Sequence, residues 1–254
     1  MSHTAAGRAR MFAVAAVLLI TPWSLAGAQA GSPLTPRELA PFDMTGYWVA
    51  LVTEEWVQRM TTPPPGDYRF VPLNAAGRAQ ADRWDPAADE AAGEACKGYA
   101  APAIMRSPSR LQIEWQDDFT LRMNIDSGTQ TRVYHFAETS PGEPSWQGHS
   151  VAGWEVSEAQ PDGSAGEGAS IGTLHVDTSN LRPGYLLKNG VPFSSETFMT
   201  EYYDLIELDS GAEYLIVQVF VDDPLYLSDH WVGTVHFRRE PDGQNFNPTP
   251  CSAF

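Results

Sequence analysis

Three ionisable residues are candidates for proton-transfer chemistry. Glu201 alternates with Met199 and Tyr203, so a β-strand would place its carboxylate on one face with apolar and aromatic side chains. In such surroundings a carboxylic acid can act as a general acid or base. Arg132 lies among aromatic residues of another predicted strand and is a candidate cation for a substrate oxygen. His149 is a candidate proton carrier because imidazole titrates near neutral pH.

Together in one cavity, these three side chains would support an isomerase, dehydratase, hydratase or lyase reaction without a cofactor. Each also has a structural interpretation: Arg132 and Glu201 would form a buried ion pair, and His149 would bind a turn carbonyl. Aromatic residues inside a barrel either fill it or line a cavity, and both alternatives stay open here. The residues that we expect to contact a substrate are Tyr134, Trp146, Trp154, Tyr202 and Asp222.

The sequence contains neither a metal-binding motif nor a nucleophile motif. Its histidines have no i, i+2 or i, i+4 pair and no HExxH pattern after residue 30. The segment Gly148-His149-Ser150 lacks the Gly-x-Ser-x-Gly pattern of serine hydrolases. We therefore expect no metal and no cofactor.

The first thirty residues have the features of a signal peptide. Arg8 and Arg10 precede the short apolar stretch 11–20, and Ala28-Gln29-Ala30 offers the small-x-small pattern of a cleavage site. Thr21 and Pro22 end the apolar stretch before it reaches the length of a membrane-spanning helix. We predict a signal peptide at 1–30, a single domain at 31–254, no membrane anchor, and a periplasmic or secreted protein.

Charge and cysteine usage agree with export. The formal net charge of −16 makes nucleic acid and anionic lipid unfavourable partners. Cys96 and Cys251 are the only two cysteines, and an oxidising compartment favours a disulfide between them. Two buried free thiols are the alternative.

Alternating apolar residues predict a chain dominated by β-strands. Leu111, Ile113 and Trp115 alternate with polar residues, and the same period recurs in later segments. The region 74–94 is the exception: it predicts a short helical excursion that is interrupted before Pro86. The fold class that we favour is all-β, an antiparallel calycin- or lipocalin-like barrel, with a two-sheet sandwich as the alternative. The other predicted strands are 46–53, 121–125, 129–136, 150–156, 172–178, 198–208, 214–221 and 231–238.

Five short segments carry a resemblance to known proteins. They are PSWQGHSVAGWE at 144–155, LHVDT at 174–178, NGVPFS at 189–194, TEYYD at 200–204 and DDPLY at 222–226. In order and spacing they resemble a large family of exported bacterial proteins that has no established activity. The family pattern usually has His where this chain has Phe193 and often has Arg where it has Tyr202. The resemblance implies an exported β-barrel and supplies no second imidazole or guanidinium.

These observations favour a periplasmic protein that handles a small, largely apolar organic molecule. Our first hypothesis is a cofactor-independent acid–base enzyme that uses Glu201, His149 and Arg132. The second is a carrier with the same cavity and no chemistry, and the third is an accessory subunit of an envelope complex. The sequence leaves the substrate and the oligomeric state open.

Overall fold

The computed structural model describes residues 33–53, 59–157 and 171–254. The predicted signal peptide at 1–30 lies outside these residues. Residues Leu34–Phe254 form one compact unit. Within the described residues, we find no helix with the length and apolar character required to cross a membrane.

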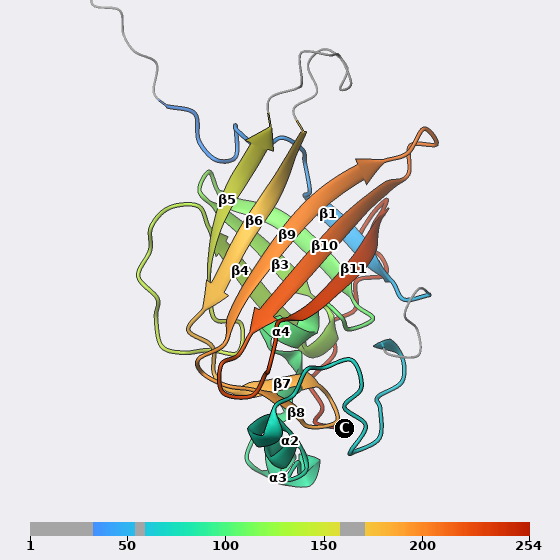
Figure 1. Cartoon of the computed structure of the whole chain (residues 1–254). Coiled ribbons are helices and arrows are strands. Elements are labelled where there is room, and N and C mark those ends of the chain that lie inside the picture. Colours follow the sequence, from blue (N-terminus) through green and yellow to red (C-terminus); the bar gives the residue numbers. More distant parts are fainter. Residues whose placement is uncertain (1–32, 54–58, 158–170) are drawn as a thin grey trace, which may run out of the picture. The chain divides into compact units, whose positions relative to one another are not determined.

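Nine strands form a closed barrel in the order β1-β11-β10-β9-β6-β5-β4-β3-β2 (Figure 1). The barrel closes because β1 pairs with both β2 and β11. This confirms the predicted all-β barrel, and the alternative of a two-sheet sandwich was wrong. The strands are β1 Gly46–Leu51, β2 Arg110–Asp117, β3 Thr120–Ile125, β4 Gln130–His135, β5 His149–Ser157, β6 Ile171–Ser179, β9 Phe198–Glu207, β10 Glu213–Asp222 and β11 Trp231–Glu240.

One junction of the barrel is parallel. β4 and β5 pair through only two residue pairs, Tyr134↔Ser150 and His135↔Val151, whereas the other neighbours in the barrel are antiparallel. The expectation of an antiparallel barrel was therefore wrong at this junction alone. Residues 136–148 return along the barrel before β5 begins (Figure 1), and such a long connection permits a parallel neighbour where a tight turn does not.

Side chains fill the barrel interior. The strands alternate buried and less buried residues, as in β3, where Leu121, Met123 and Ile125 are inside. Trp48 and Phe237 are fully buried from neighbouring strands. Filling by large side chains is the ordinary solution for a small barrel.

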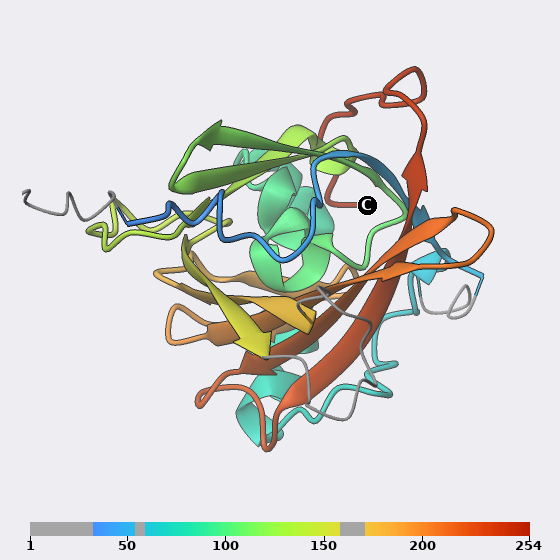
Figure 2. The same ribbon diagram turned by 90° about the horizontal axis from the view of Figure 1, so that it is seen from above.

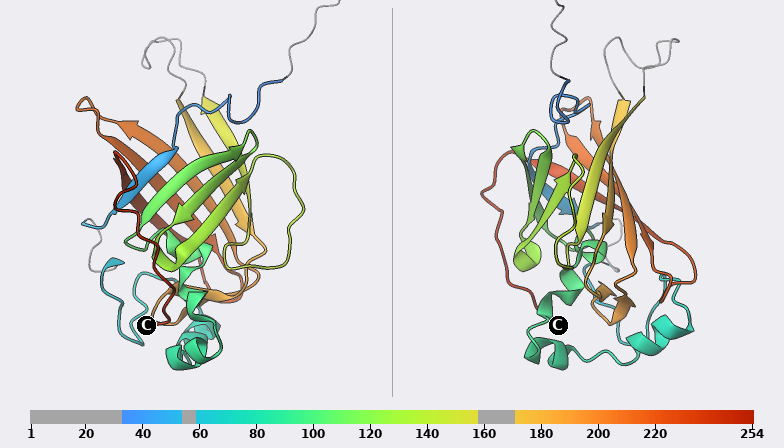
Figure 3. Two further views of the ribbon diagram at one scale, coloured as in Figure 1. Left: turned by 180° about the vertical axis from the view of Figure 1, so that it is seen from behind. Right: turned by 90° about the vertical axis from the view of Figure 1, so that its left-hand side faces the viewer.

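Short helices and a small hairpin cover the lower end of the barrel (Figure 3). Asn74 and Asp85 cap two helices by accepting hydrogen bonds from Gly77 N and Ala88 N, which confirms the predicted helical region and its interruption. The other elements were not predicted, because segments of three to five residues show no clear period. The elements are α2 Ala75–Ala81, α3 Pro86–Ala91, η1 Ala95–Tyr99, α4 Ala101–Ile104, η2 Ser127–Thr129, β7 Gly184–Leu187 and β8 Val191–Phe193.

A buried carboxylate holds the turn after β10 to the segment after β8. Asp223 accepts hydrogen bonds from Ser194 N and Oγ and from Thr197 Oγ1. It also accepts from the backbone of Leu225 and Tyr226. The Asp223 carboxylate therefore shapes the turn that follows β10.

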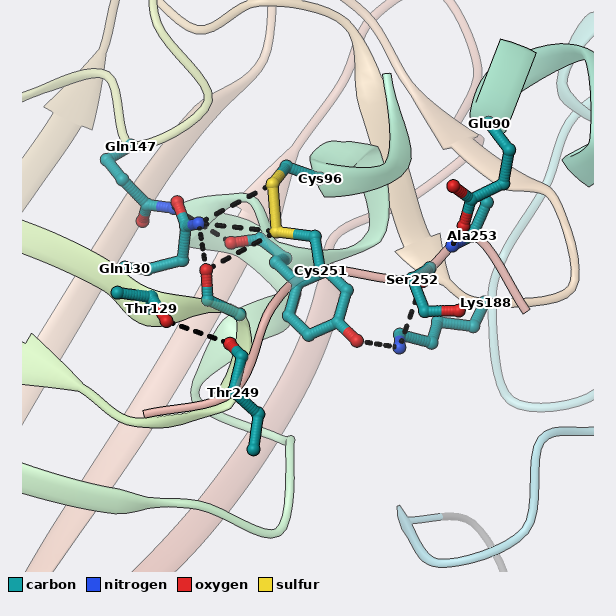
Figure 4. Close-up of a disulfide and its surroundings, with 12 residues drawn as sticks. Glu90, Cys96, Thr129, Gln130, Gln147, Lys188, Thr249, Cys251, Ser252 and Ala253 are labelled. Atoms are coloured by element: carbon teal, nitrogen blue, oxygen red, sulfur yellow. Dashed lines mark hydrogen bonds between the residues drawn. A yellow bond between two sulfur atoms is a disulfide. The ribbon is translucent and has the colours of Figure 1, made fainter. Parts of the chain in front are cut away.

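The predicted disulfide joins Cys96 and Cys251, whose Cα atoms are 5.1 Å apart (Figure 4). It fastens the C-terminal tail beneath the barrel, where Thr249 N donates to Asp126 O at 2.8 Å and Thr129 Oγ1 donates to Thr249 O at 2.9 Å. The bridge therefore belongs to the assembly of loops at the lower end.

We predict that Cys251→Ser has a lower free energy of unfolding than the parent without reductant, and the same free energy of unfolding as the parent with reductant. The bridge closes a separation of 155 residues, and chain-entropy arguments assign such a closure about 4–5 kcal/mol of unfolding free energy. Urea unfolding of parent and variant, with and without reductant, measures the difference. Equal stability of the parent in both conditions would contradict the prediction.

Candidate functional site

Arg132 and Glu201 form a bidentate ion pair inside the barrel. Arg132 Nη1 is 2.8 Å from Glu201 Oε1, and Nη2 is 2.6 Å from Oε2. Strand alternation points Arg132 inward from β4 and Glu201 inward from β9, and both side chains are fully buried. The two charges thus satisfy one another away from water.

Hydroxyl groups extend the ion pair into a buried network. Tyr203 donates to Glu201 Oε1 at 3.0 Å, and its oxygen lies 2.7 Å from the hydroxyl of Tyr134. On the other side, Arg132 Nη2 lies 3.3 Å from Thr178 Oγ1, which is 2.8 Å from Ser150 Oγ. The network therefore connects β4, β5, β6 and β9.

The surroundings hold the arginine charged and the phenols neutral. Burial alone would lower the pKa of Arg132, but the Glu201 carboxylate holds it well above its ordinary value. Burial, followed by the charge of Glu201, holds the pKa of Tyr203 well above its ordinary value. Burial also raises the pKa of Tyr134. The phenols can consequently serve as hydrogen-bond donors and not as anions.

The network has no access for a substrate. Arg132, Tyr134, Glu201 and Tyr203 each have no exposed surface. None of them lines the two hollows described below, or three further hollows in the described part of the chain. The geometry therefore favours the structural interpretation of this ion pair over a catalytic one.

The third member of the predicted catalytic group, His149, lies on the other side of the barrel wall. Ser150 points inward from β5, so the adjacent His149 points outward. Its ring stacks on that of His135 at a centroid distance of 5.2 Å, and its Nε2 lies 3.4 Å from Thr139 Oγ1. The structure does not bring His149 to Arg132 and Glu201.

Trp154, predicted to contact a substrate, lies at the upper end of the barrel. Its indole donates to Pro36 O at 2.8 Å and packs against Phe42 and Phe136 at centroid distances of 5.3 and 5.6 Å. Figure 2 looks onto this end and shows the segment before β1, in blue, crossing the ring of strands. Trp154 therefore helps to close this end of the barrel.

The remaining predicted contact residues are dispersed. Tyr202 faces outward and stacks on His175 at 4.9 Å, and Asp222 faces outward and pairs with His230. Trp146 lies in the connection before β5, where the guanidinium of Arg182 sits 4.3 Å from its ring. Together with buried Tyr134, these residues line no common cavity.

A mainly apolar hollow lies outside the barrel, below its lower rim. This hollow, which we call the apolar chamber, measures about 300 Å³. Phe70 and Val71 line it from the segment before α2, Leu187 from the end of β7, and Trp231 from the start of β11. Arg106 also lines it, with its guanidinium 5.3 Å from the Trp231 ring.

A second hollow of about 280 Å³ adjoins the first and has a different character. Among the residues that the structure describes, the lining of this polar chamber includes the cationic Arg59, Arg106 and Lys188, together with Ser107, Ser127 and Phe254, and no Asp or Glu side chain. The residues that line both chambers are Thr61, Thr62, Pro63, Arg106 and Leu187.

Sequence reasoning missed both chambers. Their walls come from several segments that are distant in the sequence, and the Pro63-Pro64-Pro65 run indicated only a break between elements. Arg106 belongs to no motif, and Lys188 lies in an unpredicted hairpin. Among residues 33–53, 59–157 and 171–254, no group of three or more His, Cys, Asp or Glu side chains is arranged to hold a metal ion.

We predict that Glu201→Gln and Arg132→Met each lower the unfolding free energy by about 3–5 kcal/mol. Each change leaves a buried group without its charged partner. The double variant Arg132→Met with Glu201→Gln removes both charges, so its loss should be much smaller than the sum of the single losses. Urea unfolding of the four proteins gives the coupling energy, and additive losses would refute a coupled pair.

A second prediction concerns pH and the imidazole pair. Burial, and next the ring of His149, lower the pKa of His135, while Asp117 opposes this shift. As pH falls, His135 therefore binds a proton at a higher pH in the unfolded chain than in the folded protein. The free energy of unfolding consequently decreases from about pH 6.5 downward. His135→Gln should lose less stability than the parent between pH 7.5 and pH 5, as measured by urea midpoints. Parallel losses in the two proteins would exclude this contribution.

Comparison with known proteins gives no assignment. No protein-family model matches the chain, and neither a curated protein nor a solved structure matches it. The two chambers and the sealed ion pair must therefore be interpreted from their own chemistry.

Proposed function

We propose that this protein is an exported binding protein for a small, largely apolar organic molecule, which it holds in the apolar chamber below the barrel. The observation that carries the proposal is the chamber itself, where an indole, a phenyl ring and two aliphatic side chains surround about 300 Å³. That volume lies at the lower end of the range for small-molecule sites, and the mainly apolar lining with a few polar groups is typical of them.

The backbone at Phe70 supports a role in binding. Phe70 has a φ of +72°, a conformation that costs a side-chain-bearing residue about 1–2 kcal/mol, and its side chain is 73% exposed. Because the Phe70 ring stays in contact with water, it contributes no hydrophobic stabilisation to the fold. An exposed ring in an unfavourable backbone conformation beside a pocket is the arrangement expected of a ligand contact.

Binding without chemistry is better supported than acid–base catalysis. The acid and the cation of the enzyme hypothesis are sealed within the barrel, and His149 faces the opposite side of the wall. A substrate in the apolar chamber would meet none of the three. We accordingly favour the carrier hypothesis, with the ligand site at the lower rim and not in the barrel interior.

We retain export to the periplasm or beyond as part of the proposal. The Cys96–Cys251 bridge supports it because disulfides persist mainly in oxidising compartments. We also propose that the barrel is of the calycin type. Unlike lipocalins, which hold a ligand inside the barrel, this protein would use the barrel as a filled platform.

We predict that Phe70→Asn weakens binding of the neutral fluorescent probe N-phenyl-1-naphthylamine by about tenfold, since a buried aromatic contact contributes on the order of 1–2 kcal/mol. Asparagine tolerates positive φ, so the variant should unfold at the same urea concentration as the parent or a higher one. Probe titrations followed by fluorescence measure the affinity.

The matched control is Phe119→Asn, which removes another exposed phenyl ring from the turn between β2 and β3. This variant should bind the probe as the parent does. If the parent does not bind the probe, or if Phe119→Asn weakens binding as much as Phe70→Asn, the apolar chamber is not the binding site.

A further inference from the structure

We infer that the ligand of the apolar chamber is an organic acid, whose carboxylate, sulfonate or similar anionic group lies in the adjoining polar chamber. This inference rests on the proposed function and adds the chemical class of the ligand. The two chambers share walls at Thr61, Thr62, Pro63, Arg106 and Leu187, so one molecule of modest length can occupy both.

Lys188 supplies the first argument. Its ammonium donates to Tyr99 OH, at 2.5 Å, and to Ser252 O, at 3.4 Å, and lies 3.8 Å from the Tyr99 ring centroid (Figure 4). These partners are neutral, so they position the ammonium without cancelling its charge. The nearby carboxylates Asp89 and Glu94 pair with another cation, Lys97.

Arg106 and Arg59 supply the second argument. Arg106 lines both chambers, so its guanidinium stands where the apolar body and the anionic group of a ligand would join. Arg59 lines the polar chamber, and its Nε and Nη1 donate to the carbonyls of Arg106 and Leu51 at 2.9 and 2.7 Å. A guanidinium has five N–H groups and can keep its own contacts while it faces an anion.

The charge of the whole chain makes this gathering of cations informative. Acidic residues outnumber lysine and arginine by 32 to 16, yet the described side chains that line the polar chamber include three cations and no Asp or Glu. A local positive region in an acidic protein favours anions at that position and disfavours them elsewhere on the surface. An apolar wall beside a cationic one matches a molecule that is apolar at one end and anionic at the other.

A pair of probes with the same apolar body tests the inference. N-phenyl-1-naphthylamine is neutral, and 8-anilinonaphthalene-1-sulfonate is the same framework with a sulfonate. The parent should bind the sulfonate about tenfold more tightly, as expected for a hydrogen bond to a charged group. Lys188→Gln should remove that preference and leave the affinity for the neutral probe unchanged, whereas Lys188→Arg should retain most of it.

The control variant is Arg37→Gln, which makes the same change of formal charge at the opposite end of the barrel, where Arg37 pairs with exposed Asp118. It should keep the preference for the sulfonate. If the parent binds neither probe, the proposed function fails. If the parent binds the neutral probe as tightly as the sulfonate, or if Arg37→Gln removes the preference as Lys188→Gln does, the binding function stands and the inference of an acidic ligand is overturned.

Discussion

The buried ion pair between Arg132 and Glu201 is the constraint on which the structure depends. A charge in a low-dielectric interior is tolerated only with a well-placed opposite charge and further hydrogen bonds. Arg132 and Glu201 meet this condition through two short contacts, and Tyr203 and Thr178 add further hydrogen-bond partners. Because these residues lie on three strands, β4, β6 and β9, the pair specifies which strands must face one another across the interior.

The same constraint determines where function can reside. Arg132 and Tyr203 engage the Glu201 carboxylate, and the large side chains around the ion pair fill the space that a ligand would need. We therefore place the proposed binding site at the lower rim, where the chain is irregular and where segments from several elements meet. This is a common division of roles, in which a rigid scaffold positions loops that carry the binding residues.

The sequence was informative where the physical signal is local. Alternation and β-branched or aromatic content predicted all nine barrel strands, and alternation placed Arg132 and Glu201 on faces with apolar side chains, which the structure shows to be inward. The same rule could have separated His149 from this pair, since Ser150 occupies the inward position. Alternation could not predict the parallel pairing of β4 with β5, because that pairing depends on the path of the long connection 136–148. It also could not predict the two chambers, because they depend on the path of the segment around Phe70.

The lower rim is held by more constraints than an ordinary set of surface loops. Asp223 fastens the turn after β10 to the segment after β8, the disulfide fastens the C-terminal tail to η1, and Asn189 donates to the carbonyl of Asp67 at 2.9 Å. These contacts fix the segments from which Phe70, Leu187 and Lys188 project. A preorganised site loses less conformational entropy on binding than a mobile one. We therefore interpret these anchors as the means by which a packed barrel supports a binding site that lies outside it.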